Sequence, residues 1–473
     1  MNTPVFAVVG HPNKGKSSLV ATLARDPSVA IGAEPGTTVR TRRFPMRVAG
    51  ETLYELADTP GFQRARAALE WMKRHEDGTA SRPAVVERFV REHAGHEYFR
   101  DEYELLKPIA EGAGIIYVVD GAAPYGPEYD AEMEILRWTG QPSMAVINPI
   151  GTPRFVDAWT NALGQFFRVV RVLDVMRAPF DQQIEVLRAF GQLKESWREP
   201  LERAVQALIA DRDRQLQDSA RVMAEMIASA LSHQEIRDIA KNDDPTRYTA
   251  ELEENYRAHL RRIERRARAE VESIYGHPGI ERSEAEMQLL ETDLLSKESW
   301  LAFGLTRRDL VTVGAIGGAL LGGMADAALL GASFLTGSVV GGLIGGTLGY
   351  LSSDKLAEIK ILHQPLGGRR LRCGPTRNLQ FPFVLLNRAR LHHAVVAGRT
   401  HAQRGILEVD TKDAAAGGLL PMLSESEKRG LAGSFDALRR SEAGTEKRRA
   451  ALDRLSAAVA QLLAVNQPRK SGH

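Results

Sequence analysis

The segment Gly10-His11-Pro12-Asn13-Lys14-Gly15-Lys16-Ser17 carries the strongest structural signal in the chain. It fits the pattern G-x-x-x-x-G-K-[ST], follows an apolar run at Val5–Val9 and opens a helical pattern at Ser17–Ala24. A glycine-rich turn between a strand and a helix lets backbone N–H groups surround phosphate oxygens, and the helix N-terminus adds partial positive charge. The segment therefore predicts a phosphate-binding loop. The alternative is a glycine-rich turn without a ligand.

Around this loop, short apolar runs alternate with helical patterns, as in an α/β fold with a parallel sheet. The expected strands are Val5–Val9, Arg43–Val48, Thr52–Ala57, Ile115–Asp120, Met144–Ile147 and Phe167–Leu173. The expected helices are Ser17–Ala24, Pro127–Trp138, Phe155–Leu163 and Gln182–Trp197. The 53 residues between Gly61 and Ile115 exceed one helix and one turn, so we expect an insertion at 62–112. These patterns predict an α/β P-loop domain over 1–198.

The rest of the chain divides into three predicted regions: a charged helical region at 199–305, a glycine-rich apolar helical hairpin at 306–354 and a basic α+β domain at 355–473. The first should hold a helix from Pro200 to about Lys241, a second ending at Tyr275 and a third at Arg282–Phe303. The last helix is expected at Ser424–Leu463.

Two short motifs follow the phosphate-binding loop in the sequence, at spacings that allow them to contribute to the same phosphate site. Pro-Gly-Thr-Thr ends at Thr38, and Asp-Thr-Pro-Gly runs from Asp58 to Gly61. Lys16 is expected to pair with the β- and γ-phosphates, and the Ser17 hydroxyl to ligate Mg²⁺. Thr38 would offer its hydroxyl to the metal and its amide to the γ-phosphate, so that its loop orders only with a triphosphate. Asp58 would hold Mg²⁺ through water, and the Gly61 amide would sense the γ-phosphate.

In this order the motifs resemble the Era/TrmE-type branch of the translation-factor-related GTPases, over roughly residues 1–190. The whole arrangement also resembles bacterial proteins that join such a domain to a C-terminal domain of unknown function. The resemblance implies a Ras-like P-loop NTPase domain that binds GTP and GDP, uses Mg²⁺ and hydrolyses GTP slowly. It implies nucleotide contacts from Gly10, Asn13, Lys14, Gly15, Lys16, Ser17, Ser18, Asp58 and Asn148. It implies catalytic roles for Lys16, Asn13, Thr38 and Gly61.

The residue after the Asp-x-x-Gly glycine is Phe62, whose phenyl ring cannot orient an attacking water. The resemblance implies that Asn13 holds a monovalent cation, K⁺, that stabilises charge as an arginine finger does. The alternative for Asn13 is a side chain that caps the turn. Gln63 is an alternative residue for positioning the water.

The base-recognition signature departs from the branch, which has Asn-Lys-x-Asp after the fifth strand. Here Asn148 is followed by Pro-Ile-Gly, and Asp174-Val175-Met176-Arg177 stands where Ser-Ala-Lys is expected. Asp157 is a candidate to reach back to the base. Buried polar groups that match a base give large selectivity, so the missing aspartate leaves guanine and adenine both open.

Residues 310–351 contain 12 glycines, no Lys or Arg and one acid, Asp326. Glycines four apart let helices approach closely, as in membrane helix pairs. As one helix the segment would span about 63 Å, so two helices in a hairpin suit a bilayer core of about 30 Å better. We expect membrane insertion from the cytoplasmic face of the inner membrane, with a water-soluble helical hairpin as the alternative.

Charge is unevenly distributed, although the whole chain carries only +2. From Lys355 to His473 there are 21 Lys and Arg against 10 Asp and Glu. This basic part is expected to face anionic membrane lipid, with RNA binding and a solvated surface as alternatives. As a switch, the protein would also engage a protein effector that the sequence does not identify.

Smaller signals limit the remaining function classes. The single cysteine, Cys373, excludes an internal disulfide and a multi-cysteine zinc site, and is expected to be structural. His93 and His96, three residues apart, are candidate metal ligands, with a solvated helix face as the alternative, and His75 lies in the same insertion. No signal peptide pattern opens the chain, which predicts a cytoplasmic protein. We expect a GTP-hydrolysing switch, with a nucleotide-gated adaptor of little turnover or an RNA-binding GTPase as alternatives.

Overall fold

The computed structural model describes residues 3–26, 28–29, 38–76, 82–240, 242–277, 351–352, 360–361, 364–365, 368–376, 380–403 and 423–465. Contacts divide the chain into two compact units. The first unit is Met1–Arg212 with Gly398–Arg404, and the second is Asp213–Ala397 with Gly405–His473. The first unit thus reaches beyond residue 198 and includes a short segment from far along the chain.

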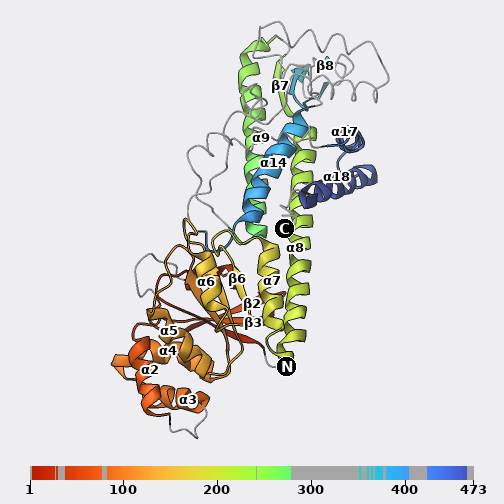
Figure 1. Cartoon of the computed structure of the whole chain (residues 1–473). Coiled ribbons are helices and arrows are strands. Elements are labelled where there is room, and N and C mark those ends of the chain that lie inside the picture. Colours follow the sequence, from red (N-terminus) through yellow and green to blue (C-terminus); the bar gives the residue numbers. More distant parts are fainter. Residues whose placement is uncertain are drawn as a thin grey trace. The chain divides into compact units, whose positions relative to one another are not determined.

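The first unit is built on a six-stranded sheet in the order β2-β3-β1-β4-β5-β6 (Figure 1). Its strands are β1 (Val5–Val9), β2 (Arg42–Val48), β3 (Glu51–Asp58), β4 (Gly114–Asp120), β5 (Ser143–Asn148) and β6 (Val170–Val172). Only the β2–β3 pair is antiparallel. The predicted strands are confirmed, because apolar runs that are buried on both faces are typical of parallel strands. The sixth strand is shorter than the predicted Phe167–Leu173.

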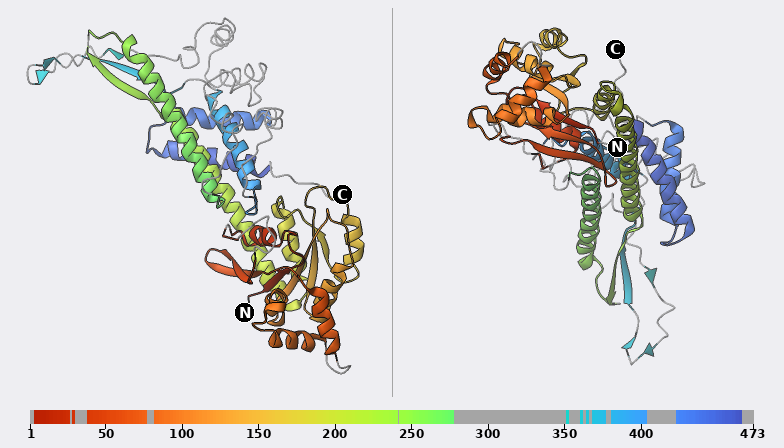
Figure 2. Two further views of the ribbon diagram at one scale, coloured as in Figure 1. Left: turned by 90° about the vertical axis from the view of Figure 1, so that its left-hand side faces the viewer. Right: turned by 90° about the horizontal axis from the view of Figure 1, so that it is seen from below.

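Helices cover both faces of this sheet, which buries two separate apolar cores (Figures 1 and 2). The helices are α1 (Lys16–Ala24), α2 (Ala65–Arg74), α3 (Arg82–Glu92), α4 (Arg100–Ala110), α5 (Glu128–Trp138), α6 (Val156–Leu163) and α7 (Phe180–Gly191), with a 3₁₀ turn at Glu97–Phe99. One core packs α1, α7 and the start of α8 (Glu195–Ser232), and the other packs α2 to α6. Helices α2, α3 and α4 occupy the stretch between β3 and β4 where an insertion was expected.

Two helix predictions are wrong in their bounds. The helix expected at Gln182–Trp197 ends at Gly191, and α8 begins at Glu195 and continues through Pro200. Helix α8 then ends at Ser232 rather than near Lys241, because residues 235–240 form strand β7 (Glu235–Ala240). Strand β7 pairs with β11 (Gly368–Cys373), more than 100 residues later in the chain. The local pattern of apolar residues does not indicate a partner at that distance, so the strand could not be predicted from it.

The second unit combines long helices with small sheets. Its further elements are α9 (Thr246–Ile274), β8 (Leu351–Ser352), β9 (Lys360–Ile361), β10 (Gln364–Pro365), α14 (Phe381–Gly398), α17 (Glu425–Arg440) and α18 (Glu446–Val465). The α9 bounds confirm the helix predicted to end at Tyr275. The helix predicted at Ser424–Leu463 is two helices, and Gly444 in the connection has a left-handed φ of 82°, a conformation that suits glycine. The predicted helix at Arg282–Phe303 lies outside the described residues.

Helices α9 and α14 lie side by side in the second unit (Figures 1 and 2). Buried charged groups join the two helices. Arg388 donates a 2.8 Å hydrogen bond to Glu264, and His392 lies 3.0 Å from Glu272. All four residues are at most 3% exposed. Part of the basic charge of 355–473 is thus paired with acids from earlier in the chain, which its sequence alone could not reveal.

No helix among the described residues is long and apolar enough to cross a membrane. The hairpin predicted at 306–354 lies outside the described residues, apart from the two residues of β8.

Candidate functional site

The loop between β1 and α1 has a backbone that requires its glycines. Gly10 has a φ of 137°, and a Cβ there would lie 2.4 Å from the carbonyl oxygen of Val118. Gly15 has a φ of 90°, and its Cβ would lie 2.3 Å from the Asn148 side-chain nitrogen. Asn13 also adopts a left-handed φ, of 59°. Glycine is the residue that such close approaches and angles favour, so the sequence motif corresponds to a real loop geometry.

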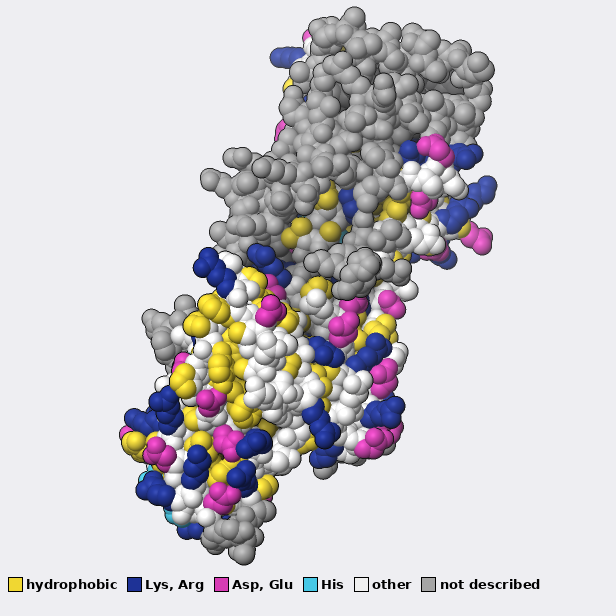
Figure 3. Space-filling view, in the orientation of Figure 1, with side chains coloured by type: hydrophobic (Ala, Val, Ile, Leu, Met, Phe, Trp, Pro, Cys, Tyr) yellow, Lys and Arg dark blue, Asp and Glu magenta, His cyan; other side chains and the backbone are white. Residues whose placement is uncertain are grey.

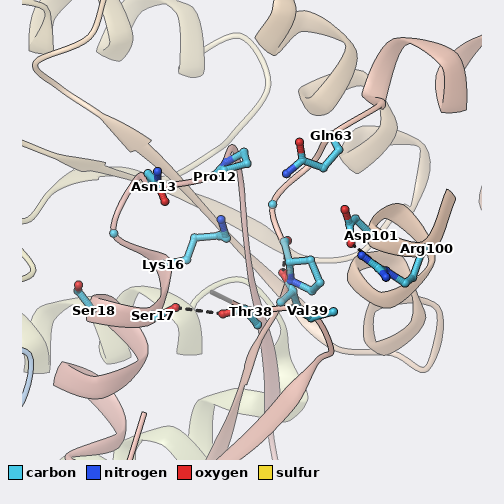
Figure 4. Close-up of a pocket in the computed structure, with 14 residues that line it drawn as sticks. Pro12, Asn13, Lys16, Ser17, Ser18, Thr38, Val39, Gln63, Arg100 and Asp101 are labelled. Carbon is cyan, nitrogen blue, oxygen red and sulfur yellow. Dashed lines mark hydrogen bonds and ion pairs between the residues drawn. The ribbon is translucent and has the colours of Figure 1, made fainter. Parts of the chain in front are cut away.

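A pocket lies beside this loop and brings together residues from four separate segments (Figure 4). Its lining residues are Pro12, Asn13, Gly15, Lys16, Ser17, Ser18, Thr38, Val39, Thr59, Pro60, Gly61, Gln63, Arg100 and Asp101. Most of the predicted site residues are therefore at one place, and Asp58 contacts two of them directly. Arg100 and Asp101 come from α4 and were not predicted.

Lys16 is buried, with 7% of the residue exposed, and its Nζ donates a 2.9 Å hydrogen bond to the carbonyl oxygen of His11. Burial lowers the pKa of Lys16 to about 8, although the nearby carboxylates of Asp58 and Glu132 oppose this shift. A buried ammonium group at the start of a helix is a strong site for a phosphate, which would supply the missing counter-charge.

Ser17, Thr38 and Asp58 converge as predicted for a metal site. The Oδ2 atom of Asp58 accepts hydrogen bonds from the Ser17 hydroxyl at 2.8 Å and the Thr38 hydroxyl at 3.1 Å. Those two hydroxyl oxygens are 3.4 Å apart. Burial raises the pKa of Asp58, while the two hydroxyls and Lys16 act in the opposite direction.

The arrangement fits Mg²⁺, the metal that GTPase domains of this kind use. Asp58 Oδ1 is buried and, among the described residues, has no hydrogen-bond partner. An unpaired buried carboxylate oxygen beside two hydroxyls is a set of hard oxygen donors. Ser17 and Thr38 would bind the ion, and Asp58 would hold it through water.

The segment after β3 lies against the phosphate-binding loop. A Cβ on Gly61 would lie 2.6 Å from the backbone nitrogen of Pro12, so glycine allows the close approach. The N–H of Phe62 donates to the carbonyl oxygen of Gly10 at 3.2 Å. The Phe62 ring is 1% exposed in the core, whereas Gln63 lines the pocket. Of these two neighbours, only Gln63 is placed to face a ligand.

Glu132 of α5 contacts the phosphate-binding loop and is not among the predicted site residues. It is 1% exposed, and its Oε1 lies 2.9 Å from Nδ1 of His11. Its Oε2 accepts a 2.8 Å hydrogen bond from the Tyr117 hydroxyl. Burial raises the pKa of Glu132. The available signal was its position between Tyr129 and Leu136 on the apolar face of α5, where a glutamate is unusual.

Asn148, which is not among the residues that line this pocket, connects two loops. Its side-chain nitrogen donates to the carbonyl oxygen of Lys14 at 3.2 Å, and its side-chain oxygen accepts from the N–H of Val175 at 3.3 Å. Both ends of the amide are thus occupied within the protein. Lys14 pairs with Asp120 at 3.4 Å. The candidate Asp157 is exposed in the first turn of α6, so its role toward a base stays a prediction.

The loop that contains Val175 contacts the segment 398–403, which was not expected to belong to this domain. The Thr400 hydroxyl donates a 2.7 Å hydrogen bond to the carbonyl oxygen of Met176. The Thr22 hydroxyl of α1 donates a hydrogen bond to the carbonyl oxygen of Val175, also at 2.7 Å. Ala402 is 1% exposed in the same core.

The histidines of the insertion belong to an aromatic cluster. Trp71 stacks on His75 at 3.9 Å between ring centroids and contacts His93 edge to face at 5.0 Å. Nδ1 of each of these histidines lies 2.8 Å from a backbone carbonyl oxygen one turn earlier. One ring nitrogen of each is thus occupied in its own helix. His96 is exposed, as a solvated helix face predicts, whereas His75 and His93 are half-buried in this cluster.

One other group in the described part of the chain could offer metal ligands: His233, Glu235 and His259. The two imidazole rings stack face to face, 3.4 Å apart and 5° from parallel. Their nitrogen lone pairs therefore lie in two parallel planes and cannot converge on one point, as the ligands of a tetrahedral site do. Cys373 is buried, and burial raises the pKa of its thiol to about 11, as expected for a structural cysteine.

The sheet order, the phosphate-binding loop and the convergence of Lys16, Ser17, Thr38 and Asp58 define the first unit as a P-loop GTPase domain. A family model described as "50S ribosome-binding GTPase" matches residues 5–148. The chain belongs to the family described as "Domain of unknown function (DUF3482)", whose model matches residues 160–463, more than half of the chain. The predicted combination of a GTPase domain with a C-terminal domain of unknown function is confirmed.

Individual relatives resemble part of the chain. GTPase Der of Paraburkholderia phymatum is 26% identical over 166 residues, which cover 35% of this chain and 30% of that protein. GTPase Der of Burkholderia cenocepacia is 30% identical over 145 residues, 31% of this chain and 26% of that protein. The chain thus spans under a third of the length of these relatives. A point variant of Aquifex aeolicus Era bound to GDP·AlF₄⁻ is 16% identical and covers 59% of this chain and 91% of its own, with a TM-score of 0.30.

Proposed function

We propose that the chain is a GTP-binding switch that hydrolyses GTP slowly with Mg²⁺. The observation that supports this most is the Asp58 carboxylate, which accepts hydrogen bonds from both Ser17 and Thr38 and keeps one buried oxygen unpaired. In the reaction, a water oxygen bonds to the γ-phosphorus while the bond to the β–γ bridging oxygen breaks. GDP leaves with that electron pair, and the proton of the water passes to the phosphate or to solvent.

Each residue of the site has a defined task in this proposal. Lys16 and the loop N–H groups bind the β- and γ-phosphates, and the Gly61 amide binds a γ-phosphate oxygen. Thr38 connects the metal site to the segment before β2, so that this segment responds to loss of the γ-phosphate. Asn13 would hold K⁺ beside the bridging oxygen. Its φ of 59° equally suits a residue that only shapes the turn. Only the K⁺-binding role would make GTP hydrolysis faster in K⁺ than in Na⁺.

Nucleotide binding by the full chain tests the proposal. Fluorescent GTP and ATP analogues should be titrated with and without Mg²⁺, and phosphate release should be measured under single-turnover conditions. Lys16→Ala should abolish triphosphate binding because the phosphates lose their main counter-charge. Lys73→Ala, an exposed lysine of α2, is the matched control and should bind like the wild type.

The possible results separate the alternatives. Unchanged triphosphate affinity in Lys16→Ala contradicts the phosphate-binding assignment. Tight GTP binding without turnover in any salt supports a nucleotide-gated adaptor instead of an enzyme. Preference for ATP would mean that Asn148, without the usual aspartate, does not select guanine.

We also propose that the switch acts at a membrane, through the glycine-rich segment 310–351. The support comes from its sequence: 42 residues without Lys or Arg, preceded by Arg307-Arg308 and followed by a basic region. The basic charge available to lipid or RNA is smaller than the sequence count suggests, because Arg388 is buried against Glu264. On the face of the first unit shown in Figure 3, acidic and basic side chains are intermixed.

Flotation with vesicles and alkaline carbonate washing test this part. The wild type should stay with the membrane after carbonate, because apolar helices and not surface charge give the affinity. Leu320→Arg with Leu343→Arg should release the protein, since each arginine costs about 2.5–3.5 kcal/mol at the bilayer centre. Recovery of the wild type without detergent as a defined monomer or dimer contradicts membrane insertion, and retention on RNA would favour the RNA-binding alternative.

A further inference from the structure

Helix α4 of the insertion holds the segment that follows the Asp-x-x-Gly motif. Glu102 is 1% exposed, and its Oε1 accepts hydrogen bonds from the backbone N–H groups of Gln63 at 2.9 Å and Arg64 at 2.5 Å. A carboxylate with two backbone donors is a strong, charge-assisted contact. The position of Gln63 in the pocket is therefore set by a helix that lies outside the shared G-domain motifs.

The same helix also holds the segment that follows Thr38. The backbone N–H of Thr41 donates to Oε2 of Glu104 at 2.9 Å, and the Thr41 hydroxyl donates to the Glu104 carbonyl oxygen at 2.6 Å. Thr41 stands directly before β2 and three residues after Thr38. Two residues of one helical turn thus fix both segments that are expected to respond to the γ-phosphate.

Arg100, the first residue of α4, lines the pocket together with Lys16, Ser17 and Gly61. Figure 4 shows Arg100 and Asp101 on the side of the pocket across from Asn13 and Ser18. The Arg100 side chain is 54% exposed and lies 3.6 Å from the Asp101 carboxylate. The same helical turn carries the acids Asp101 and Glu102, so the exposed guanidinium already has a carboxylate partner. A bound phosphate would replace Asp101 as that partner.

The reaction needs positive charge on this side of the pocket. In phosphoryl transfer, negative charge spreads over the γ-phosphate oxygens and the bridging oxygen in the transition state. Phe62 cannot help, because its ring is buried in the core. Lys16 approaches from the phosphate-binding loop, which leaves the opposite side to α4.

We infer that the helical insertion is a built-in activator of GTP hydrolysis, in which Glu102 and Glu104 hold the two switch segments and Arg100 donates to the γ-phosphate oxygens in the transition state. The inference rests on the proposed function and adds a catalytic residue to it. The step is the one written above: water bonds to the γ-phosphorus, GDP leaves with the bridging oxygen, and Arg100 neither gains nor loses a proton.

Arg100→Ala in the full chain tests the inference. Single-turnover hydrolysis should fall about 30-fold or more, the ratio between GTPases with such an arginine in the same chain and those without one. Affinity for GDP and for a non-hydrolysable GTP analogue should change less than about threefold. Binding of GDP with aluminium fluoride, which imitates the transition state, should be lost. Arg100→Lys should recover only part of the rate, since an ammonium lacks the planar fork of donors.

Arg91→Ala is the matched control, because Arg91 is an exposed arginine of α3 in the same insertion. It should leave hydrolysis and aluminium fluoride binding at wild-type levels. If the wild type hydrolyses GTP and Arg100→Ala matches it in rate and in aluminium fluoride binding, the inference is wrong and the proposed function stands. If the wild type binds no nucleotide, both are wrong.

Discussion

The hydroxyl of Thr400 donates a 2.7 Å hydrogen bond to the carbonyl oxygen of Met176, which is 224 positions earlier in the chain. Met176 belongs to the loop that stands where a G domain has its last base-facing motif. Ala402 is buried in the same core as Val175 of that loop. The short segment at 398–404 is therefore part of the G-domain unit, and so is the start of α8. The natural unit is larger than 1–198.

We predict that a chain ending at residue 198 is much less stable than one ending at 212. The longer form keeps four apolar residues of the core, namely Leu201, Ala204, Val205 and Leu208. Burial of a leucine or valine contributes about 1.5–3 kcal/mol, so the difference should exceed about 3 kcal/mol in urea unfolding with GDP present. Equal unfolding midpoints for the two forms would contradict this placement of α8.

The Thr400 contact has its own test in the full chain. Thr400→Val keeps the side-chain shape and removes the donor, which should cost about 1 kcal/mol. Amide hydrogen exchange in the loop from Asp174 to Ala178 should then become faster. Thr160→Val is the control, because the Thr160 hydroxyl bonds only within its own helix, to Val156. Unchanged exchange in Thr400→Val would show that the segment does not stabilise the loop.

Triphosphate binding should weaken as pH rises above about 8. The pKa of Lys16 is lowered to about 8 in the free protein, and a bound phosphate favours the ammonium form. Binding above this pH must therefore take up a proton. Dissociation constants from pH 7 to 9.5, and calorimetry in two buffers of different ionisation enthalpy, would measure the effect. Lys16→Arg stays charged over this range and should show a flatter profile, at lower affinity.

The same pKa has a consequence for folding. The unfolded chain holds the Lys16 proton up to about pH 10.5, and the folded chain loses it near pH 8. The unfolded state thus binds more protons between these values, so stability of the nucleotide-free protein should rise with pH through this window. Glu132→Gln removes a carboxylate that favours the ammonium, and should move the fall in nucleotide affinity to lower pH.

Asp58→Asn should separate stability from metal binding. Burial raises the pKa of Asp58, which means that the ionised carboxylate destabilises the nucleotide-free fold. The asparagine variant should keep or increase the melting temperature without nucleotide. It should also lose the Mg²⁺ dependence of triphosphate affinity, because the water ligand loses its charged acceptor. A lower melting temperature with Mg²⁺ dependence retained would contradict the assigned role.

The sequence predicted the local features of the first unit well. The strands and the phosphate-binding loop are encoded in short contiguous runs, and apolar alternation and glycine spacing identify them directly. Ser17, Thr38 and Asp58 could be placed together because the order of three motifs implied a known topology. The three residues that converge at the candidate metal site therefore come from motifs about 20 residues apart in the sequence.

The missed features depend on partners far along the chain. Glu102 contacts Gln63 from a helix that was expected only as part of an insertion, and Thr400 contacts Met176 across 224 positions. Strand β7 was expected to be helical because its pairing with β11 leaves no local pattern. Glu132 is the exception, since a glutamate on an apolar helix face is visible in the sequence and its burial follows from its neighbours.

The last prediction concerns the two candidate sources of positive charge in the transition state. If Asn13 holds K⁺, hydrolysis should be faster in K⁺ than in Na⁺, and removal of the side chain should abolish the difference. Asn13 has a left-handed φ of 59°, so alanine would add backbone strain. Asn13→Gly removes the amide without that strain and is the better variant.

A double-mutant cycle separates Asn13 from Arg100. The two residues lie on opposite sides of the pocket (Figure 4), and effects of separate groups on the same barrier are expected to add. Arg100→Ala should therefore lower the rate by the same factor in K⁺ and in Na⁺, and the K⁺ advantage should persist until Asn13→Gly is added. Equal rates in both salts for the wild type would leave Asn13 as a cap on the turn. The charge stabilisation would then come from Lys16 and Arg100.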